Sequence, residues 1–428
     1  MGIVATKAFI RNELAEIKAA SEGKSIQEVA DQVQQELNLL ENTTLNIAIT
    51  GVSGAGKSSL VNALRGVADD DEGAARTGLL ETTVNPARYP HPKFPNVVIW
   101  DLPGIGTPEF KSNEYLKRVN FSRYDFFIIV SGDRFTQHDT KLADEIWKMK
   151  MKFYFVRTKI DTGLDSERRK RGFDEKATLE MIRNYCGENL RKAGESSPKV
   201  FLISSWHPEK YDFPLLQETL MNGLDDLKRE VLMMALPTCS KEVSERKKAA
   251  MESLIWKFAL RSCAIGAIPV PGLSFVCDVV ILVHAMERFC NVFGLDEVSL
   301  QKVADSVGQP VSELKSAIKK SPQAGEIKAE FVIDRLSRMA LCASARAVES
   351  ALGLIPVLGS LTGAGLSFVT TYWVLKSFLN DVMEDAENVR AKAVELGKKS
   401  SKKISVHPLG KRSTTYRCAE DKNIKTQA

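Results

Sequence analysis

The sequence has few cysteines, and none of them are closely paired. Seven cysteines occur among 428 residues, and no two are spaced as Cys-x-x-Cys. An odd number without such pairs argues against a disulfide framework and against a zinc site. The amino terminus also lacks the apolar core of a secretory signal, since charged, helix-forming sequence follows Thr6. We therefore expect reduced thiols and a cytoplasmic protein.

An excess of charge of one sign is absent from most of the chain. The 59 Lys and Arg exceed the 54 Asp and Glu, but nine of the former and only two of the latter lie in residues 396–428. The rest of the chain is mildly acidic, which argues against a nucleic-acid partner. The basic tail is either a solvated, disordered segment or a contact for an anionic membrane.

The sequence divides into four segments. Residues 1–42 have helical spacing, with Ser25 and Glu28 as a capping box. Residues 43–230 alternate short apolar runs with helical stretches, which predicts an α/β domain with a mostly parallel sheet. Residues 235–395 are nearly all helical in pattern, and 396–428 form the basic tail. The runs expected as strands are 45–50, 97–100, 126–130, 153–156 and 200–203.

One apolar stretch in the helical part, Ala351 to Leu375, carries no charged residue. It is long enough to cross a bilayer. However, it contains four glycines, one proline and five Ser or Thr residues, which fill a membrane poorly. We interpret it as a buried or membrane-dipping helical hairpin. A plain core hairpin and a true span remain as alternatives.

A phosphate-binding loop follows the first expected strand. The segment from Gly51 to Ser58 fits G-x-x-x-x-G-K-[ST] between an apolar run and a helical stretch that stops at Gly66. Glycines allow backbone N–H groups to surround phosphate oxygens, and the helix amino terminus favours an anion. Lys57 would reach the β- and γ-phosphates, and Ser58 would bind Mg²⁺. The nucleotide-binding candidates here are Gly51, Gly54, Gly56, Lys57, Ser58 and Ser59.

A second motif, Asp101-Leu-Pro-Gly104, follows the run 97–100. The Asp101 carboxylate would hold Mg²⁺ through water, and the Gly104 N–H would contact the γ-phosphate. A threonine between the two motifs is needed to complete the metal shell. Thr83 is our first candidate and Thr82 the second, and both are alternatively plain loop residues.

The base-binding candidates are Thr158, Lys159 and Asp161, which follow the run 153–156. A carboxylate at position 161 would accept hydrogen bonds from N1 and N2 of guanine, which adenine does not offer. The Lys159 stem would cover the base. Ser204 and Ser205 follow the last run, where a backbone N–H would meet guanine O6, or they form only a serine turn. These residues favour GTP and GDP as substrate and product over an ATPase or small-molecule kinase.

No glutamine follows Gly104. Ile105 stands there and cannot orient the attacking water as the glutamine of Ras-like proteins does. The isolated monomer should therefore hydrolyse GTP slowly.

In the order of these motifs the chain resembles the immunity-related GTPases, the interferon-inducible, dynamin-like p47 family. The similar strings are residues 51–59, 75–83, 95–106, 124–129 and 152–161. Lys57 is typical of the branch with GKS in the phosphate loop. The resemblance implies a Ras-like domain inserted in an all-α domain built from amino- and carboxyl-terminal helices. It also implies self-assembly through facing nucleotide sites, in which Glu81 would activate hydrolysis; otherwise Glu81 is a solvated loop residue.

The resemblance further implies cell-autonomous innate immunity, exerted on the membranes of vacuoles that hold pathogens. Partners would be further copies of the chain, related GTPases and a membrane surface. Met1-Gly2-x-x-x-Thr6 fits the pattern for myristoylation at Gly2, but a single acyl chain binds weakly and needs a second signal. A GTP-gated membrane scaffold with incidental hydrolysis is the alternative function.

Overall fold

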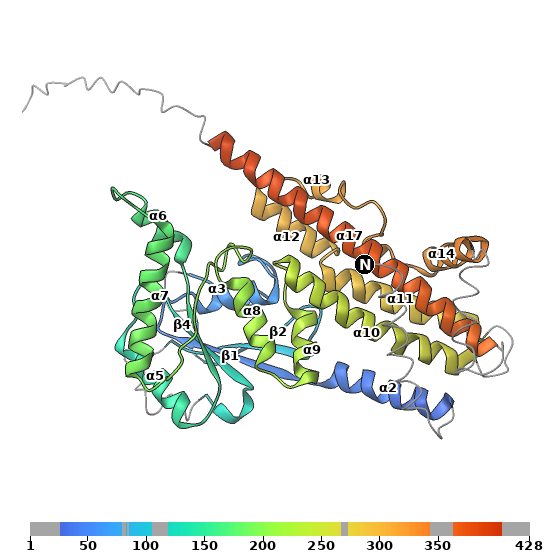
Figure 1. The fold of residues 1–428 in the computed structure, drawn as a ribbon, viewed down its shortest axis with the longest axis horizontal. Helices are drawn as coiled ribbons and strands as arrows, with labels where there is room; N and C mark the ends of the chain where they lie inside the picture. Colours follow the sequence, from blue (N-terminus) through green and yellow to red (C-terminus); the bar gives the residue numbers. More distant parts are fainter. Residues whose placement is uncertain are drawn as a thin grey trace, which may run out of the picture.

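The computed structural model describes residues 26–78, 83, 85–104, 119–266, 273–342 and 363–404. Two regions follow one another along the long axis of the molecule (Figure 1). One contains a six-stranded sheet flanked by helices, and the other consists of long helices. This is the expected fold class, a Ras-like α/β domain combined with a helical domain.

The sheet has the strand order β2-β3-β1-β4-β5-β6. Every neighbouring pair is parallel except β2 and β3. The central strand β1 pairs in parallel with both β3 and β4, so the carboxyl ends of these three strands lie side by side. The strands are β1 (Leu45–Gly51), β2 (Ala87–Pro90), β3 (Val97–Asp101), β4 (Phe126–Ser131), β5 (Phe153–Arg157) and β6 (Val200–Leu202).

Both faces of the sheet are buried, which explains the nearly continuous apolar runs. Ile47 and Ile49 of β1 point into one core, and Ala48 between them belongs to the other. The first face is covered by α3 (Lys57–Arg65), α8 (Phe213–Asn222) and α9 (Asp226–Ala235). The second is covered by α5 (Gln137–Lys148), α6 (Ile160–Glu167) and α7 (Glu175–Lys192).

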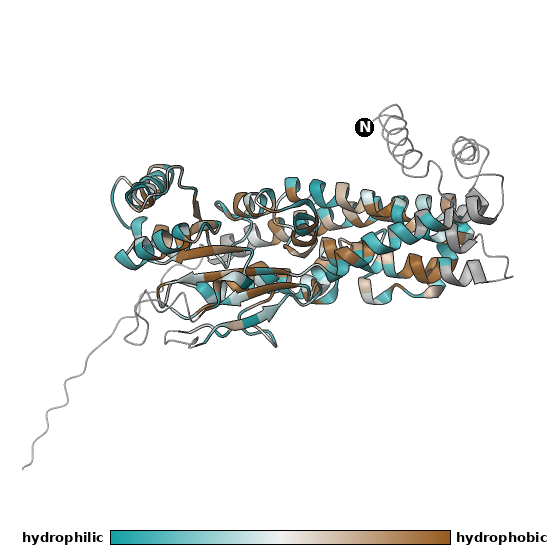
Figure 2. Ribbon diagram, turned by 90° about the horizontal axis from the view of Figure 1, so that it is seen from below, coloured by the Kyte–Doolittle hydropathy of each residue, from teal (hydrophilic) through white to brown (hydrophobic). Residues whose placement is uncertain are grey.

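The helical domain is built around α10 (Lys241–Gly266), which packs against α2 (Ile26–Asn42), α11 (Leu273–Phe293) and α17 (Gly363–Ile404). Helices from both ends of the chain therefore share one bundle. Apolar residues concentrate in the strands and on the inward sides of these helices (Figure 2). The shorter elements are α12 (Glu297–Val307), α13 (Val311–Lys315), α14 (Ala329–Cys342) and the 3-10 helices η1 (Phe121–Arg123) and η2 (Ala324–Glu326).

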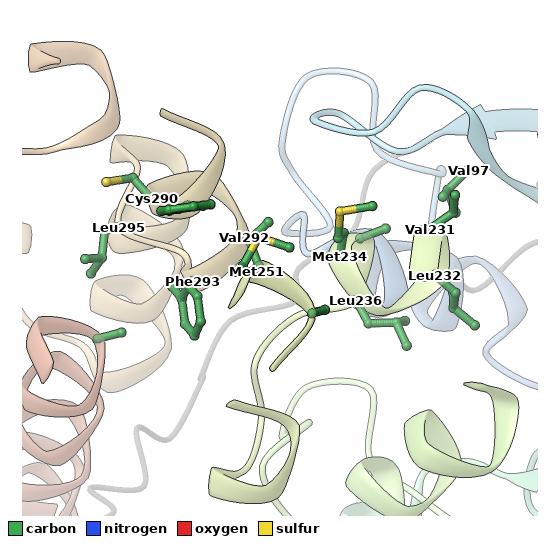
Figure 3. Packing of buried hydrophobic residues seen from close by; sticks show 14 of the residues in the cluster. Val97, Val231, Leu232, Met234, Leu236, Met251, Cys290, Val292, Phe293 and Leu295 are labelled. Carbon is green, nitrogen blue, oxygen red and sulfur yellow. The ribbon is translucent and has the colours of Figure 1, made fainter. Parts of the chain in front are cut away.

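One apolar core continues from the sheet into the helical domain. Side chains of β3, α9 and α11 follow one another in Figure 3, from Val97 through Met234 to Phe293. Lys247 of α10 is buried in this region. Its Nζ donates to the carbonyls of Leu236, 2.6 Å away, and Val292, 2.8 Å away. It thus satisfies carbonyls at the ends of α9 and α11. Burial lowers the pKa of Lys247 to about 7.

The described structure differs from the sequence expectations in two places. Strand β2 was not expected, because a four-residue edge strand containing Arg88 and Pro90 has no apolar pattern. Helix α17 runs on to Ile404, past the start of the expected tail at 396, because Lys is a good helix former. Of the stretch Ala351 to Leu375, only Gly363 onward lies in the described residues, as the start of α17.

No helix within the described ranges is long and apolar enough to cross a membrane. Among the described residues, Cys186, Cys239 and Cys290 are free thiols.

Candidate nucleotide-binding site

The phosphate loop connects the end of β1 to α3. Gly54 and Gly56 have φ values of 74° and 86°, a left-handed conformation that favours glycine. Gly56 is the residue that caps α3, whose free N–H groups therefore open toward the loop. The helix ends at Gly66, as the sequence predicted. Loop and first turn hold Gly51, Gly54, Gly56, Lys57, Ser58 and Ser59.

Three oxygen-bearing side chains converge beside this loop. Ser58 Oγ donates to Asp101 Oδ2 at 2.6 Å, and Thr83 Oγ1 donates to the same oxygen at 2.9 Å. Asp101 stands at the end of β3, next to β1, and is almost fully buried. Its other oxygen, Oδ1, is buried without a hydrogen-bond partner. The arrangement brings together a serine, a threonine and a carboxylate that are 18 to 43 positions apart in sequence.

The environment of Asp101 suits a hard cation. Burial raises the pKa of Asp101, while the hydrogen bond from Ser58, the charge of Lys57 and the hydrogen bond from Thr83 lower it. A buried carboxylate with one unpaired oxygen is stabilised by a nearby positive charge. Hydroxyl and carboxylate oxygens are ligands that Mg²⁺ accepts, usually together with water and phosphate oxygens. Ser58, Thr83 and Asp101 therefore fit the metal that the sequence predicted.

A cavity of about 130 Å³ lies over the phosphate loop. Lys57 lines it with its Nζ 3.0 Å from the carbonyl of Val52, and its side chain is largely buried. Gly104 also lines it, and a Cβ there would lie 2.9 Å from the backbone nitrogen of Ser53, so only glycine fits. Three further residues line the cavity, Ser53, Thr77 and Gly78. Single loop residues of these types carry no distinctive sequence pattern.

The base-binding candidates meet at the carboxyl ends of β5 and β6. Thr158 Oγ1 donates to the Ala55 carbonyl at 2.6 Å, which ties this edge to the phosphate loop. Lys159 caps α6 in a left-handed conformation, with φ of 56°, and is one of the residues that line the phosphate cavity. Asp161 lies in the first turn of α6 and lines a second cavity, of about 480 Å³. Buried Ser204 and the neighbouring Ser205 follow β6.

The two cavities differ in composition. The larger one is lined by charged residues and an aromatic residue from α6, α7 and the segment after β6: Asp161, Asp165, Arg168, Glu175, His207, Lys210 and Tyr211. The smaller one lies at the glycines and hydroxyls of the phosphate loop. Volume alone would favour the larger cavity, but the chemistry for phosphate lies in the smaller one. Glu81, Thr82 and Ile105 lie outside the described residues.

A doubly covered, mostly parallel sheet with a phosphate loop after β1 and an aspartate at the end of β3 defines the class of P-loop nucleotide-binding proteins. The family described as interferon-inducible GTPase (IIGP) matches residues 11–393. The chain is 42% identical over 430 residues to Interferon-inducible GTPase 5 of Rattus norvegicus, covering 99% of this chain and 92% of that protein. It belongs to the interferon-inducible, immunity-related GTPase family.

Two further relatives are also similar over most of the chain. Interferon-inducible GTPase 5 of Bos taurus is 42% identical over 95% of this chain and 87% of its own length. Interferon-gamma-inducible GTPase 10 of Mus musculus is 37% identical over 91% of each chain. The similarity therefore includes the helical domain as well as the nucleotide site.

Proposed function

We propose that the protein binds GTP with Mg²⁺ and hydrolyses it to GDP and phosphate at the phosphate loop. The convergence of Ser58, Thr83 and Asp101 is the observation that carries the proposal. When bound, Mg²⁺ would neutralise charge on the β- and γ-phosphates. Ser58 and Thr83 would hold the metal directly and Asp101 through water.

The remaining residues of the site would bind and orient the nucleotide. Lys57 would contact the β- and γ-phosphates, and the Gly104 N–H the γ-phosphate. At the other end, the Asp161 carboxylate would accept hydrogen bonds from guanine N1 and N2, and the Lys159 stem would cover the base. A backbone N–H at Ser204 or Ser205 would donate to guanine O6.

We infer that hydrolysis is activated by self-assembly. The chain lacks a water-orienting glutamine after Gly104, since Ile105 stands there. The family resemblance supports a dimer with facing nucleotide sites in which Glu81 assists hydrolysis. Further copies of this chain or related GTPases would supply the second site.

The family also supports a role in cell-autonomous immunity at the membranes of pathogen-containing vacuoles. Residues 43–230 would form the GTPase domain, and residues 235–395 with 1–42 the helical domain. Membrane contact would come from myristoylated Gly2 together with the apolar segments or the basic residues 396–428. If hydrolysis is incidental, the same features would make a GTP-gated membrane scaffold.

The test is GTP turnover per molecule, measured across a wide range of protein concentration. Wild type, Glu81→Ala and Lys57→Ala are compared, with ATP as the alternative substrate. Turnover that rises with concentration in wild type, stays flat in Glu81→Ala and is lost in Lys57→Ala supports the assembling GTPase. Slow, flat turnover in wild type with tight GTP binding would instead favour the scaffold.

A further inference from the structure

Trp206 is the most exposed of the large apolar side chains in the described part of the chain. Its exposed fraction is 67%, compared with 55% for Trp147 and 62% for Met181. An indole carries a large apolar surface, and leaving it in water forgoes the free energy that burial would provide. Single exposed apolar side chains are common, so the significance of Trp206 depends on what lies around it.

The backbone around Trp206 is held firmly at the nucleotide edge of the sheet. The Ile160 N–H, at the start of α6, donates to the Ile203 carbonyl at 3.3 Å. Ser204 is 1% exposed, and its Oγ accepts from the His207 N–H at 3.3 Å, which closes a turn around Trp206. The turn is thus fixed beside Lys159 and Asp161, while the indole remains uncovered.

The residue after Trp206 lines a cavity beside α6. Asp161 of α6 and His207, which directly follows Trp206, line the same cavity of about 480 Å³. A purine is flat, and its edge and its two faces need different partners. A carboxylate such as Asp161 reads the edge, whereas apolar or aromatic groups cover the faces.

We propose that the indole of Trp206 stacks on the guanine base, opposite the aliphatic stem of Lys159. This inference rests on the proposed GTP site and adds a residue that sets its affinity. Stacking on an aromatic side chain is nearly independent of base identity, because every base has a π-face. Trp206 would therefore strengthen the binding of guanine nucleotides without making the site selective for guanine. The selectivity for guanine would come from Asp161.

Because the contact is to the base, its loss should weaken the binding of GDP and of a non-hydrolysable GTP analogue by the same factor. Truncation in Trp206→Ala should raise both dissociation constants roughly tenfold, within the range for losing one base stack. Trp206→Phe keeps an aromatic face and should stay within about threefold of wild type. Trp147→Ala removes another exposed indole, on α5, and should leave both constants unchanged.

The experiment is calorimetric titration of the full-length protein and these three variants with each nucleotide and Mg²⁺. Tryptophan emission is recorded in parallel, and a change on GDP binding should be present in wild type and absent in Trp206→Phe. Circular dichroism checks that the variants are folded. The stacking proposal would be overturned if Trp206→Ala bound the nucleotides as tightly as wild type. It would also be overturned if the Ala and Phe variants lost nucleotide affinity equally.

Two further outcomes separate this inference from the proposed function. If Trp206→Ala binds normally but loses only the rise of turnover with protein concentration, the indole is a contact between copies and the stacking role is wrong. If wild type binds ADP as tightly as GDP and Trp206→Ala weakens both, the stack holds and guanine selectivity fails. Absence of nucleotide binding by wild type would overturn both.

Discussion

Lys302 of α12 donates a hydrogen bond from Nζ to the carbonyl oxygen of Val67, at a distance of 2.8 Å. Val67 directly follows Gly66, the residue that ends the phosphate-loop helix α3. Nearby, Lys93 in the turn between β2 and β3 binds Asp296 at the start of α12. Helix α12 thus contacts the segment after α3 and the turn before β3. The opposite ends of α3 and β3 hold the phosphate loop and Asp101.

We predict that Lys302→Met loosens the carboxyl end of α3. The substitution keeps the aliphatic stem but leaves the buried Val67 carbonyl without its donor, at a cost of about 1–2 kcal/mol. Amide hydrogen exchange around Gly66 and Val67 should become faster, and the melting temperature should fall by a few degrees. Lys315→Met on α13 removes an ion pair with Glu297 that is more exposed, and should change little. Unaltered exchange at Val67 would contradict the prediction.

A second prediction concerns the base. Asp161→Asn should abolish the preference for GDP over ADP, because the amide presents a donor where guanine N1 or N2 also donates. The same amide can donate to the second carbonyl of xanthine, so the diphosphate of xanthosine should compete better than in wild type. Glu167→Gln, on the same helix but outside the lining of the cavity that Asp161 lines, is the matched control. Competition binding with the three nucleotides measures the effect, and an unchanged preference for GDP would refute the role of Asp161.

A third prediction follows from the pKa of Lys247, which burial lowers to about 7. In the unfolded chain its pKa is near the ordinary value of about 10.4. Above pH 7 the unfolded state therefore binds the extra proton, and the free energy of unfolding should rise with pH. Lys247→Met should reduce that slope between about pH 7 and pH 8.5, below the ordinary cysteine pKa.

Urea unfolding at several pH values measures this slope. Lys302, whose pKa is also lowered, to about 8, contributes in both proteins, so only the difference reports Lys247. The variant should also be less stable at every pH, because the carbonyls of Leu236 and Val292 lose their donor. Parallel curves for variant and wild type would show that Lys247 does not titrate in this range.

A fourth prediction concerns Asp385 of α17, which is fully buried. Its carboxylate accepts from the backbone N–H groups of Lys319, Lys320 and Ser321, and from Ser321 Oγ. Asp385→Ala leaves these donors without an acceptor and should lower the free energy of unfolding by about 3 kcal/mol. Glu384→Ala removes only an exposed pair with Lys320 and should cost less than about 1 kcal/mol. Equal losses in chemical unfolding would argue against the buried carboxylate as the cause.

The sequence predicted those parts of the molecule that depend on neighbouring residues. The strand at 45–51 and the helix that ends at Gly66 follow from local apolar runs and a glycine stop. The placement of Asp101 beside Ser58 also follows, because it comes from the order of parallel strands in a sheet.

Contacts between distant segments could not be predicted in this way. Lys93 and Asp296 are 203 positions apart, and neither stands in a recognisable motif. Strand β2 forms only because β3 offers a free edge beside it. An isolated tryptophan after Ser204 and Ser205 forms no recognisable sequence pattern. The significance of Trp206 depends on its exposure, which only the three-dimensional structure provides.

The sharing of one bundle by α2 and α10 has a consequence for biosynthesis. Leu37 and Leu40 of α2 are buried, and Glu36 of α2 pairs with Lys257 of α10 at 3.2 Å. At ordinary ribosomal speeds of about 5–20 residues per second, the roughly 200 residues between the two helices take about 10–40 s to synthesise. The apolar side of α2 therefore lacks its partner α10 during this interval. A nascent-chain chaperone that shields α2 during that interval would keep its apolar side from non-native contacts.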